Sequence, residues 1–200
     1  MKSDVIKWFK VNQHVTKISF SLCHIRLTWI QFADFLSRTE VKELFIDFCT
    51  FDPSIICDKV LMALPHLEII QIQPRYPCLL NELTDQTLIH WANSSSIPKT
   101  IQIRNGCASR ITVEGVKLMI LKALSADPES TSKIDWDFGL LLGPAQSDSS
   151  LLSLILCPGL ETKVNDDFRS RRINLSRPNF DLQLFVPAPF PVQPTPMPAF

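Results

Sequence analysis

Six cysteines are the first residues of this 200-residue chain whose side chains could carry chemistry. No two of them form a CxxC pair, so their spacing gives no support for a zinc site. Cys23 is followed directly by His24, but neighbouring residues of a strand point to opposite faces, which prevents a nucleophile–base pair there. We interpret Cys23 and Cys49 as packing residues, with catalysis and regulation by oxidation as alternatives.

Two carboxylates, Asp135 and Asp137, are the other candidates for chemistry. Side chains two residues apart on a strand share a face, so the pair could do acid–base work or hold a metal ion. Such pairs more often belong to a solvated face. We therefore expect no enzyme, no cofactor and no metal, and keep a hydrolase that uses this acidic pair as an alternative.

The charge and composition narrow the class of partner. Lysine plus arginine and aspartate plus glutamate number 20 each, so the formal net charge is zero. Nucleic acid and anionic membranes select a basic excess, and we expect neither as the partner. The start of the chain carries no apolar signal segment, and no apolar run reaches the roughly 18 residues of a membrane span. These features predict a cytoplasmic or nuclear protein with reduced thiols.

The stretches "VTKISFSLC" and "VKELFIDFC" show that the chain is built from repeated units. They share one layout of apolar places followed by a cysteine, and they begin 26 positions apart, at Val15 and Val41. "LEIIQI" continues the frame after another 26 positions, and "PKTIQI" and "TSKIDW" continue it after 31 and 33 positions. In these later units Arg75, Gly106 and Gly139 take the place of the cysteine.

A segment typical of a helix follows each of the first four strand-like stretches. These segments are "LTWIQFADFL", "SIICDKVLMAL", "LTDQTLIHWA" and "ITVEGVKLMILKAL". Thr84 and Thr112 are natural N-caps, and an acidic residue follows each in the first helical turn. The alternation predicts an α/β fold: an irregular leucine-rich-repeat-like array of β–α units, with a parallel sheet on one face and helices on the other. An ordinary α/β domain with evenly spaced strands is the alternative.

The order of these pieces resembles a known family. "VKELFIDF", "LMALPHLEIIQI", "HWANSSSIPKTIQI" and "ITVEGVKLMILKALSADPE" are similar in order and type to the nematode F-box-associated FTH domain, and the units resemble cysteine-type leucine-rich repeats. The resemblance covers about residues 35–140. It implies an adaptor that captures a partner or substrate for a Skp1–cullin ubiquitin ligase. We identify no F-box in the chain, so an orphan globular domain or a truncated paralogue without a ligase role is the alternative.

The sequence divides into three regions on this interpretation. Residues 1–14 form a lead-in, 15–142 the repeat domain, and 143–200 a linker and a proline-rich, largely disordered tail. "GPAQSDSS" is typical of a linker, and "LLSLILC" could add a last strand or helix. "VPAPFPVQPTPMPAF" is too rich in proline for a helix or a central strand.

The residues between the apolar places are expected on the concave, uncovered side of the sheet. Phe45 and Ile69 are predicted near its centre, where apolar side chains ringed by polar groups suit a protein interface. Coverage of this face by the C-terminal segment is the alternative. The predicted partner-binding residues are Glu43, Phe45, Asp47, Ile69, Gln71, Gln73, Gln102 and Arg104.

Overall fold

The fold was analysed in a computed structural model, which describes residues 14–95, 97–104, 106–125, 133–143, 159–166 and 170–187. Five of its strands form a parallel sheet in the order β1-β3-β4-β6-β8. Their bounds are Lys17–Ser21 (β1), Glu43–Phe51 (β3), Ile69–Pro74 (β4), Thr100–Ile103 (β6) and Ile134–Leu141 (β8). Sequence order and spatial order agree, which confirms the predicted succession of β–α units.

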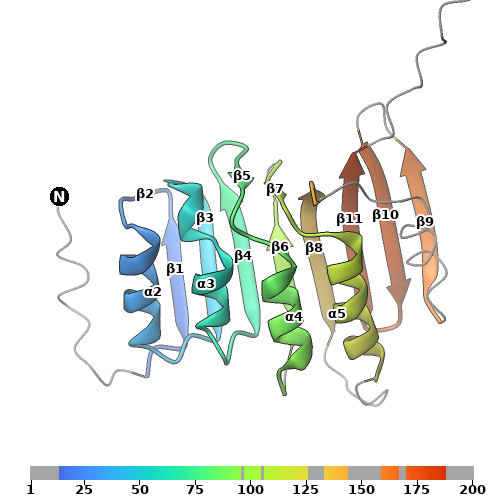
Figure 1. Ribbon diagram of the computed structural model, residues 1–200, viewed down its shortest axis with the longest axis horizontal. Coiled ribbons are helices and arrows are strands. Elements are labelled where there is room, and N and C mark those ends of the chain that lie inside the picture. Colours follow the sequence, from blue (N-terminus) through green and yellow to red (C-terminus); the bar gives the residue numbers. More distant parts are fainter. Residues whose placement is uncertain are drawn as a thin grey trace, which may run out of the picture.

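Helical segments connect these strands. They are α2 (Trp29–Ser37), the 3₁₀ helix η1 (Pro53–Ile55), α3 (Asp58–Met62), α4 (Asp85–Asn93) and α5 (Val113–Ser125). In Figure 1 the four α-helices lie side by side on one face of the sheet. The structure therefore confirms the α/β class and the arrangement with helices on one face of a parallel sheet. None of the described helices is long and apolar enough to cross a membrane.

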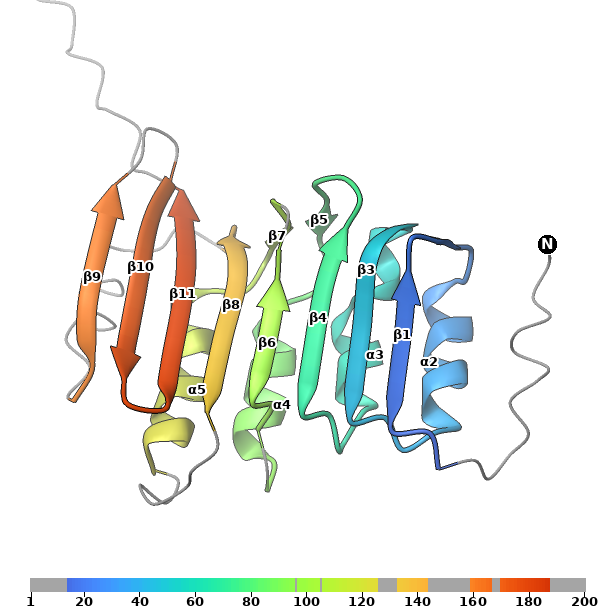
Figure 2. The same cartoon turned by 180° about the vertical axis from the view of Figure 1, so that it is seen from behind.

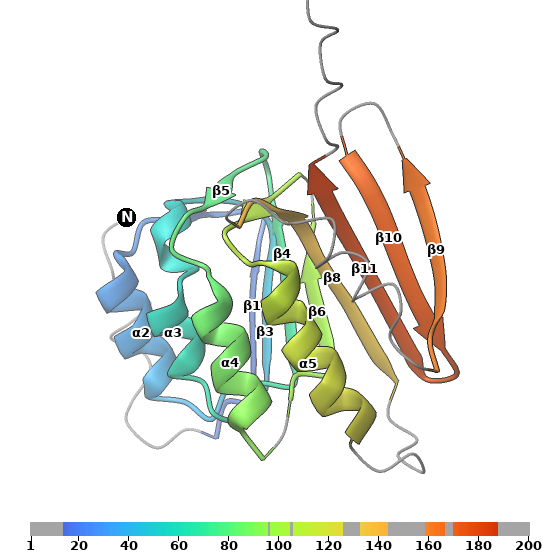
Figure 3. The same ribbon diagram turned by 45° about the vertical axis from the view of Figure 1, so that its right-hand side comes forward.

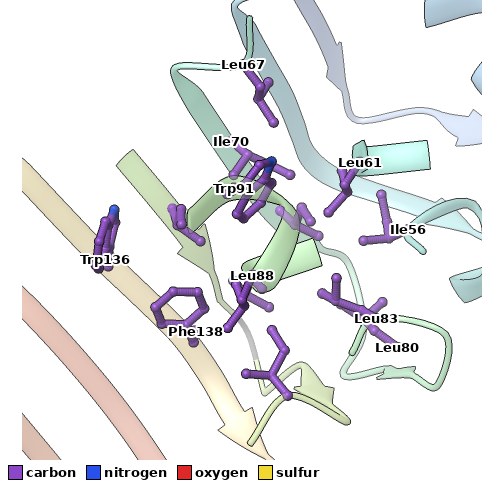
Figure 4. Packing of buried hydrophobic residues seen from close by; sticks show 14 of the residues in the cluster. Ile56, Leu61, Leu67, Ile70, Leu80, Leu83, Leu88, Trp91, Trp136 and Phe138 are labelled. Atoms are coloured by element: carbon purple, nitrogen blue, oxygen red, sulfur yellow. The ribbon is translucent and has the colours of Figure 1, made fainter. Parts of the chain in front are cut away.

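The alternation of side chains along the strands explains how the helix layer is held. Leu44 and Ile46 of β3 and Ile70 and Ile72 of β4 are at most 1% exposed, because they point to the helices. Figure 4 shows the same apolar core around Trp91 of α4. A cavity of about 10 Å³ lies among these side chains. That is about the size of one water molecule, so the cavity is a packing defect of the core rather than a ligand site.

Threonines and aspartates join the beginnings of successive helices. The Asp58 carboxylate accepts hydrogen bonds from the backbone N–H and the hydroxyl of Thr84, at 2.9 and 2.6 Å. One unit later, the Asp85 carboxylate accepts the same two bonds from Thr112, at 2.7 and 2.6 Å. Thr84 also caps α4 by accepting the Gln86 N–H, as predicted. Each carboxylate thus fixes the position of the next helix.

Short second strands follow some of the main strands. They are β2 (His24–Ile25), β5 (Leu79–Leu80) and β7 (Ala108–Ser109). β2 pairs with the end of β3, β5 pairs with β7, and β7 pairs with β8. These short ladders join neighbouring units at the C-terminal ends of the main parallel strands.

The predicted cysteine positions need a correction in the later units. The residue that follows Cys49 donates its backbone N–H to the Cys23 carbonyl at 3.0 Å. In the same way, the residue after Cys107 donates to the Cys78 carbonyl, and the residue after Gly139 donates to the Cys107 carbonyl, each at 3.0 Å. Gly139 therefore takes the predicted place, whereas Cys107 rather than Gly106 occupies it in the fourth unit.

In the third unit, the irregularity of β3 shifts the frame by one residue. Phe48 adopts a positive φ of 47°, and Cys49 pairs with Pro74 instead of Arg75. A local bulge of this kind adds one residue to one strand only, so a constant spacing along the sequence misses it.

The prediction of a linker and tail over 143–200 was wrong for much of that region. Residues 159–166 and 170–187 contribute β9 (Glu161–Asp166), β10 (Ser170–Arg177) and β11 (Phe180–Pro187). β11 lies parallel to β8, β10 is antiparallel to β11, and β9 pairs antiparallel with β10. Figure 3 shows these three strands continuing the sheet beyond α5. The proline-rich segment 188–200 and the predicted lead-in up to residue 13 lie outside the described residues.

Alternating apolar residues explain why the C-terminal segment forms strands. Ile173 and Leu175 of β10 and Leu182 and Leu184 of β11 are at most 2% exposed and belong to the same hydrophobic core as the repeats. The turn between the two strands has Asn179 at a φ of 64°, a conformation that asparagine tolerates well. The repeats and the C-terminal strands therefore form one packed unit, and the boundary predicted at residue 142 is not a domain boundary.

Candidate partner-binding face

The strands have a second face that points away from the helices. Figure 2 shows the sheet from this side, which we call the uncovered face. Paired residues run across it in one row, one from each strand, because the registers of neighbouring strands match. In the order of the sheet, the row contains Ser19, Phe45, Gln71, Gln102, Asp137, Gln183, Asn174 and Lys163.

The structure brings the eight predicted residues together on this face. Glu43 pairs with Ile69, Phe45 with Gln71, and Asp47 with Gln73 across β3 and β4. Gln71 in turn pairs with Gln102 of β6. Arg104 follows β6 and is exposed, and the other seven are half-buried.

Phe45 lies on the uncovered face among charged groups. The Lys17 Nζ lies 4.6 Å from the centre of the Phe45 ring, within the range of a cation–π interaction. The same ammonium group lies 3.2 Å from the Glu43 carboxylate. The prediction that Phe45 and Ile69 lie near the centre was wrong, because β3 and β4 are the second and third strands of the eight in the main path of the sheet. Because β11, β10 and β9 extend the sheet beyond β8, the centre of the uncovered face lies close to β8.

A second aromatic side chain of this face was missed by the sequence analysis. Phe185 of β11 is half-buried, and the Arg172 guanidinium lies 5.4 Å from the centre of its ring. Both residues come from the segment that was interpreted as a tail. The alternation in "FDLQLFV" could have revealed it, because Phe180, Leu182 and Leu184 mark one face and leave Phe185 on the other.

Amides and a carboxylate of β6, β8, β10 and β11 form hydrogen bonds on the same face. The Gln102 side-chain amide donates a hydrogen bond to the Asp135 carboxylate at 3.1 Å. The Gln183 amide donates to the Asn174 side-chain oxygen at 3.1 Å. The candidate site is therefore a polar strip that carries one phenylalanine on β3 and another on β11, with a cation over each ring.

The acidic pair of β8 lies in this strip. Burial raises the pKa of the Asp137 carboxyl, while the Gly139 N–H, which donates to it at 3.0 Å, and the charges of Arg104 and Arg172 oppose the shift. Asp135 is engaged by Gln102. Among the described residues, no group of three or more His, Cys, Asp or Glu side chains is placed to hold a metal ion. The two carboxylates thus take part in side-chain and backbone hydrogen bonds within the sheet.

Cys23, Cys49, Cys78 and Cys107 lie next to the short ladders, at the end of the main strands. Cys49 is buried, and its thiol donates to the Asp47 carbonyl at 3.3 Å. This agrees with the predicted packing role of Cys49, whereas Cys23 is exposed, which does not fit the same prediction for that residue.

Comparisons with known proteins leave the chain without an assigned family. No protein-family model matches it, and neither a curated protein nor a solved structure is significantly similar to it.

Proposed function

We propose that this chain is a non-catalytic protein-interaction domain whose partner binds the uncovered face. The main support is the continuous row of paired side chains across eight strands, together with Phe45 on the second strand and Phe185 on the sixth. Aromatic side chains surrounded by polar groups are the usual anchors of protein interfaces. Strands β9, β10 and β11 extend the sheet and form part of the uncovered face, so the alternative in which the C-terminal segment covers this face is not the one we propose.

A protein partner suits the charges of this face better than nucleic acid does. Lys17 forms an ion pair with Glu43. Arg172 lies over the Phe185 ring, and its charge also acts on the Asp137 carboxyl. Nucleic-acid sites present many unpaired cations to phosphates. The uncovered face instead presents hydrogen-bonding amides and carboxylates of both β8 and β11, which favours a partner with its own peptide or side-chain donors.

The resemblance to F-box-associated domains suggests a specific context for this binding. In that context the face would capture a partner or a substrate for a Skp1–cullin ubiquitin ligase. The support is the order of motifs in residues 35–140 together with the array of β–α units. A domain of the same fold without a ligase role is the second candidate.

Affinity capture with matched variants tests the binding face. The test variant carries Phe45→Ala and Ile69→Ser, which remove two apolar contacts of the uncovered face. The control carries Leu121→Ser, because Leu121 is 48% exposed on α5, which covers the other face of the sheet. We expect partners that the wild-type and control chains retain and that the test variant loses by at least tenfold, measured by quantitative mass spectrometry.

Two further measurements separate the candidates. If the test variant retains its partners, the uncovered face is not the binding site. A loss of partners supports this face only if the melting temperature of the variant stays near that of the wild type. Purified Skp1 is then titrated against the full chain. Direct binding supports the ligase context, whereas binding of other proteins without Skp1 supports an interaction domain with no ligase role.

A further inference from the structure

Two pairs of thiols connect neighbouring units of the repeat. The sulfur atoms of Cys23 and Cys49 are 3.4 Å apart, and those of Cys78 and Cys107 are also 3.4 Å apart. The partners of each pair are separated by 26 and 29 residues in the sequence. Both contacts are therefore made by the stacking of one unit on the next.

The same backbone hydrogen bond lies beside both pairs. The residue after Cys49 donates its N–H to the Cys23 carbonyl at 3.0 Å, and the residue after Cys107 donates to the Cys78 carbonyl at 3.0 Å. Hydrogen-bonded neighbouring strands lie about 4.8 Å apart. A disulfide needs Cα atoms roughly 4.4–6.8 Å apart, so the two sulfur atoms of each pair could bond without separation of the strands.

Each pair combines a buried thiol with a more accessible one. Cys49 and Cys107 have no exposed surface, whereas Cys23 is exposed and Cys78 is half-buried. A small oxidant from solvent would reach Cys23 or Cys78 first, and the buried partner would already lie within reach of the oxidised sulfur.

We propose that Cys78 and Cys107 form a peroxide-sensitive dithiol that closes to a reversible disulfide between the third and fourth units. The Cys78 thiolate attacks hydrogen peroxide: an S–O bond forms, the O–O bond breaks, and hydroxide leaves and takes up a proton to become water. The Cys107 sulfur then attacks the Cys78 sulfenic acid, the S–S bond forms, and the hydroxyl leaves as water with the Cys107 proton. Two thiols are oxidised by two electrons in total, and one peroxide is reduced to two waters.

The surroundings of the two pairs indicate which one reacts first. A hydrogen bond from Cys107 lowers the pKa of the Cys78 thiol, although its partial burial opposes this. Burial, with a smaller contribution from Cys49, raises the pKa of Cys23 to about 11. The thiolate is the nucleophile, so Cys78 is expected to be oxidised faster than Cys23 at neutral pH, by roughly tenfold or more.

Peptide mapping of the full chain after peroxide treatment tests the proposal. Trypsin places Cys78 in residues 76–99 and Cys107 in residues 105–110, so a disulfide joins two separate peptides. A Cys157→Ser background removes the thiol outside the described residues. We expect the linked peptide pair to form before the pair that contains Cys23 and Cys49, to disappear with dithiothreitol, and to raise the melting temperature by about 5–10 °C.

Variants provide the mechanistic control. In Cys107→Ala, the sulfenic acid of Cys78 loses its partner, so dimedone labelling of Cys78 should rise at least fivefold. In Cys57→Ala, which changes a buried cysteine at the start of α3, formation of the disulfide should be unchanged. Oxidation of Cys78 to sulfinic acid with Cys107 still reduced in the wild type would overturn the proposal. So would a failure of the linked peptides to appear under conditions that oxidise glutathione. The wild-type measurement decides the question even if Cys107→Ala folds poorly.

Discussion

Strands β3, β4 and β6 have an apolar, buried face and a more polar, half-buried face, and residues of the two faces alternate along each strand. On the helix side, Leu44, Ile70 and Ile101 are at most 1% exposed. On the uncovered face, their neighbours Phe45, Gln71 and Gln102 are half-buried and paired across the strands. The register of each strand therefore determines both which side chains lie in the core and which lie on the candidate interface.

Polar groups also differ between the two sides. On the helix side, Asp58 and Asp85 each accept two hydrogen bonds from the threonine that begins the next helix. On the uncovered face, Asp135 accepts from a glutamine side chain and Asp137 from the turn at Gly139. The carboxylates of the helix layer therefore join successive units, whereas those of the uncovered face bond to groups within the sheet.

The largest predicted contrast lies between adjacent residues of β3. Leu44→Ala should lower the free energy of unfolding by about 2–5 kcal/mol, because it leaves a cavity in the core. Phe45→Ala should cost less than about 1 kcal/mol, because it removes a half-buried ring and one cation–π contact. Urea unfolding of the two variants measures both values. Equal losses would show that the assigned register of β3 is wrong.

The next prediction concerns the links between helices. Asp85→Ala should lower the free energy of unfolding by about 1–3 kcal/mol, because the Thr112 N–H and hydroxyl lose their acceptor. Gly115→Ala should also destabilise, since a methyl group there would overlap the Asp85 carboxylate. This reverses the usual gain of about 1 kcal/mol for Gly→Ala inside a helix. Thermal and urea unfolding of both variants check these values.

A double variant tests whether Asp85 and Gly115 share this contact. In the Asp85→Ala background the overlap is gone, so adding Gly115→Ala should cost little or should stabilise. A double-mutant cycle measures this coupling between the two residues. Strictly additive effects would mean that Asp85 and Gly115 do not share the contact.

The smallest predicted effect belongs to the acidic pair of the uncovered face. Burial raises the pKa of Asp137, so the folded chain binds a proton more readily there than the unfolded chain does. The ionised carboxylate therefore lowers stability at neutral pH, and this penalty disappears as the pH falls through the folded-state pKa. Asp137→Asn keeps an acceptor for the Gly139 N–H and should stabilise at pH 7 by less than about 1 kcal/mol.

Unfolding at several pH values checks the sign of this effect. The advantage of Asp137→Asn should shrink as the pH falls from 7 to 4, because the wild-type carboxyl becomes neutral. An advantage that stays constant or grows over this range would mean that the carboxyl is stabilised in its ionised form.

The period of the apolar residues in the sequence was enough to predict the units between residues 15 and 142. Strand alternation and N-caps depend on neighbours a few residues away, so "VKELFIDFC" and Thr84 indicated their own structures. For the same reason, the eight predicted residues fall on one face of the observed sheet.

Only the tertiary structure decided that strands after β8 join the sheet and which distant residues meet. The pairing of β11 with β8, the position of Phe185 and the contact of Cys78 with Cys107 all join residues far apart in the sequence. The bulge at Phe48 changed the frame by one residue. Local patterns do not encode strand order, because the free energy of a pairing comes from the partner strand and from the core that both strands bury.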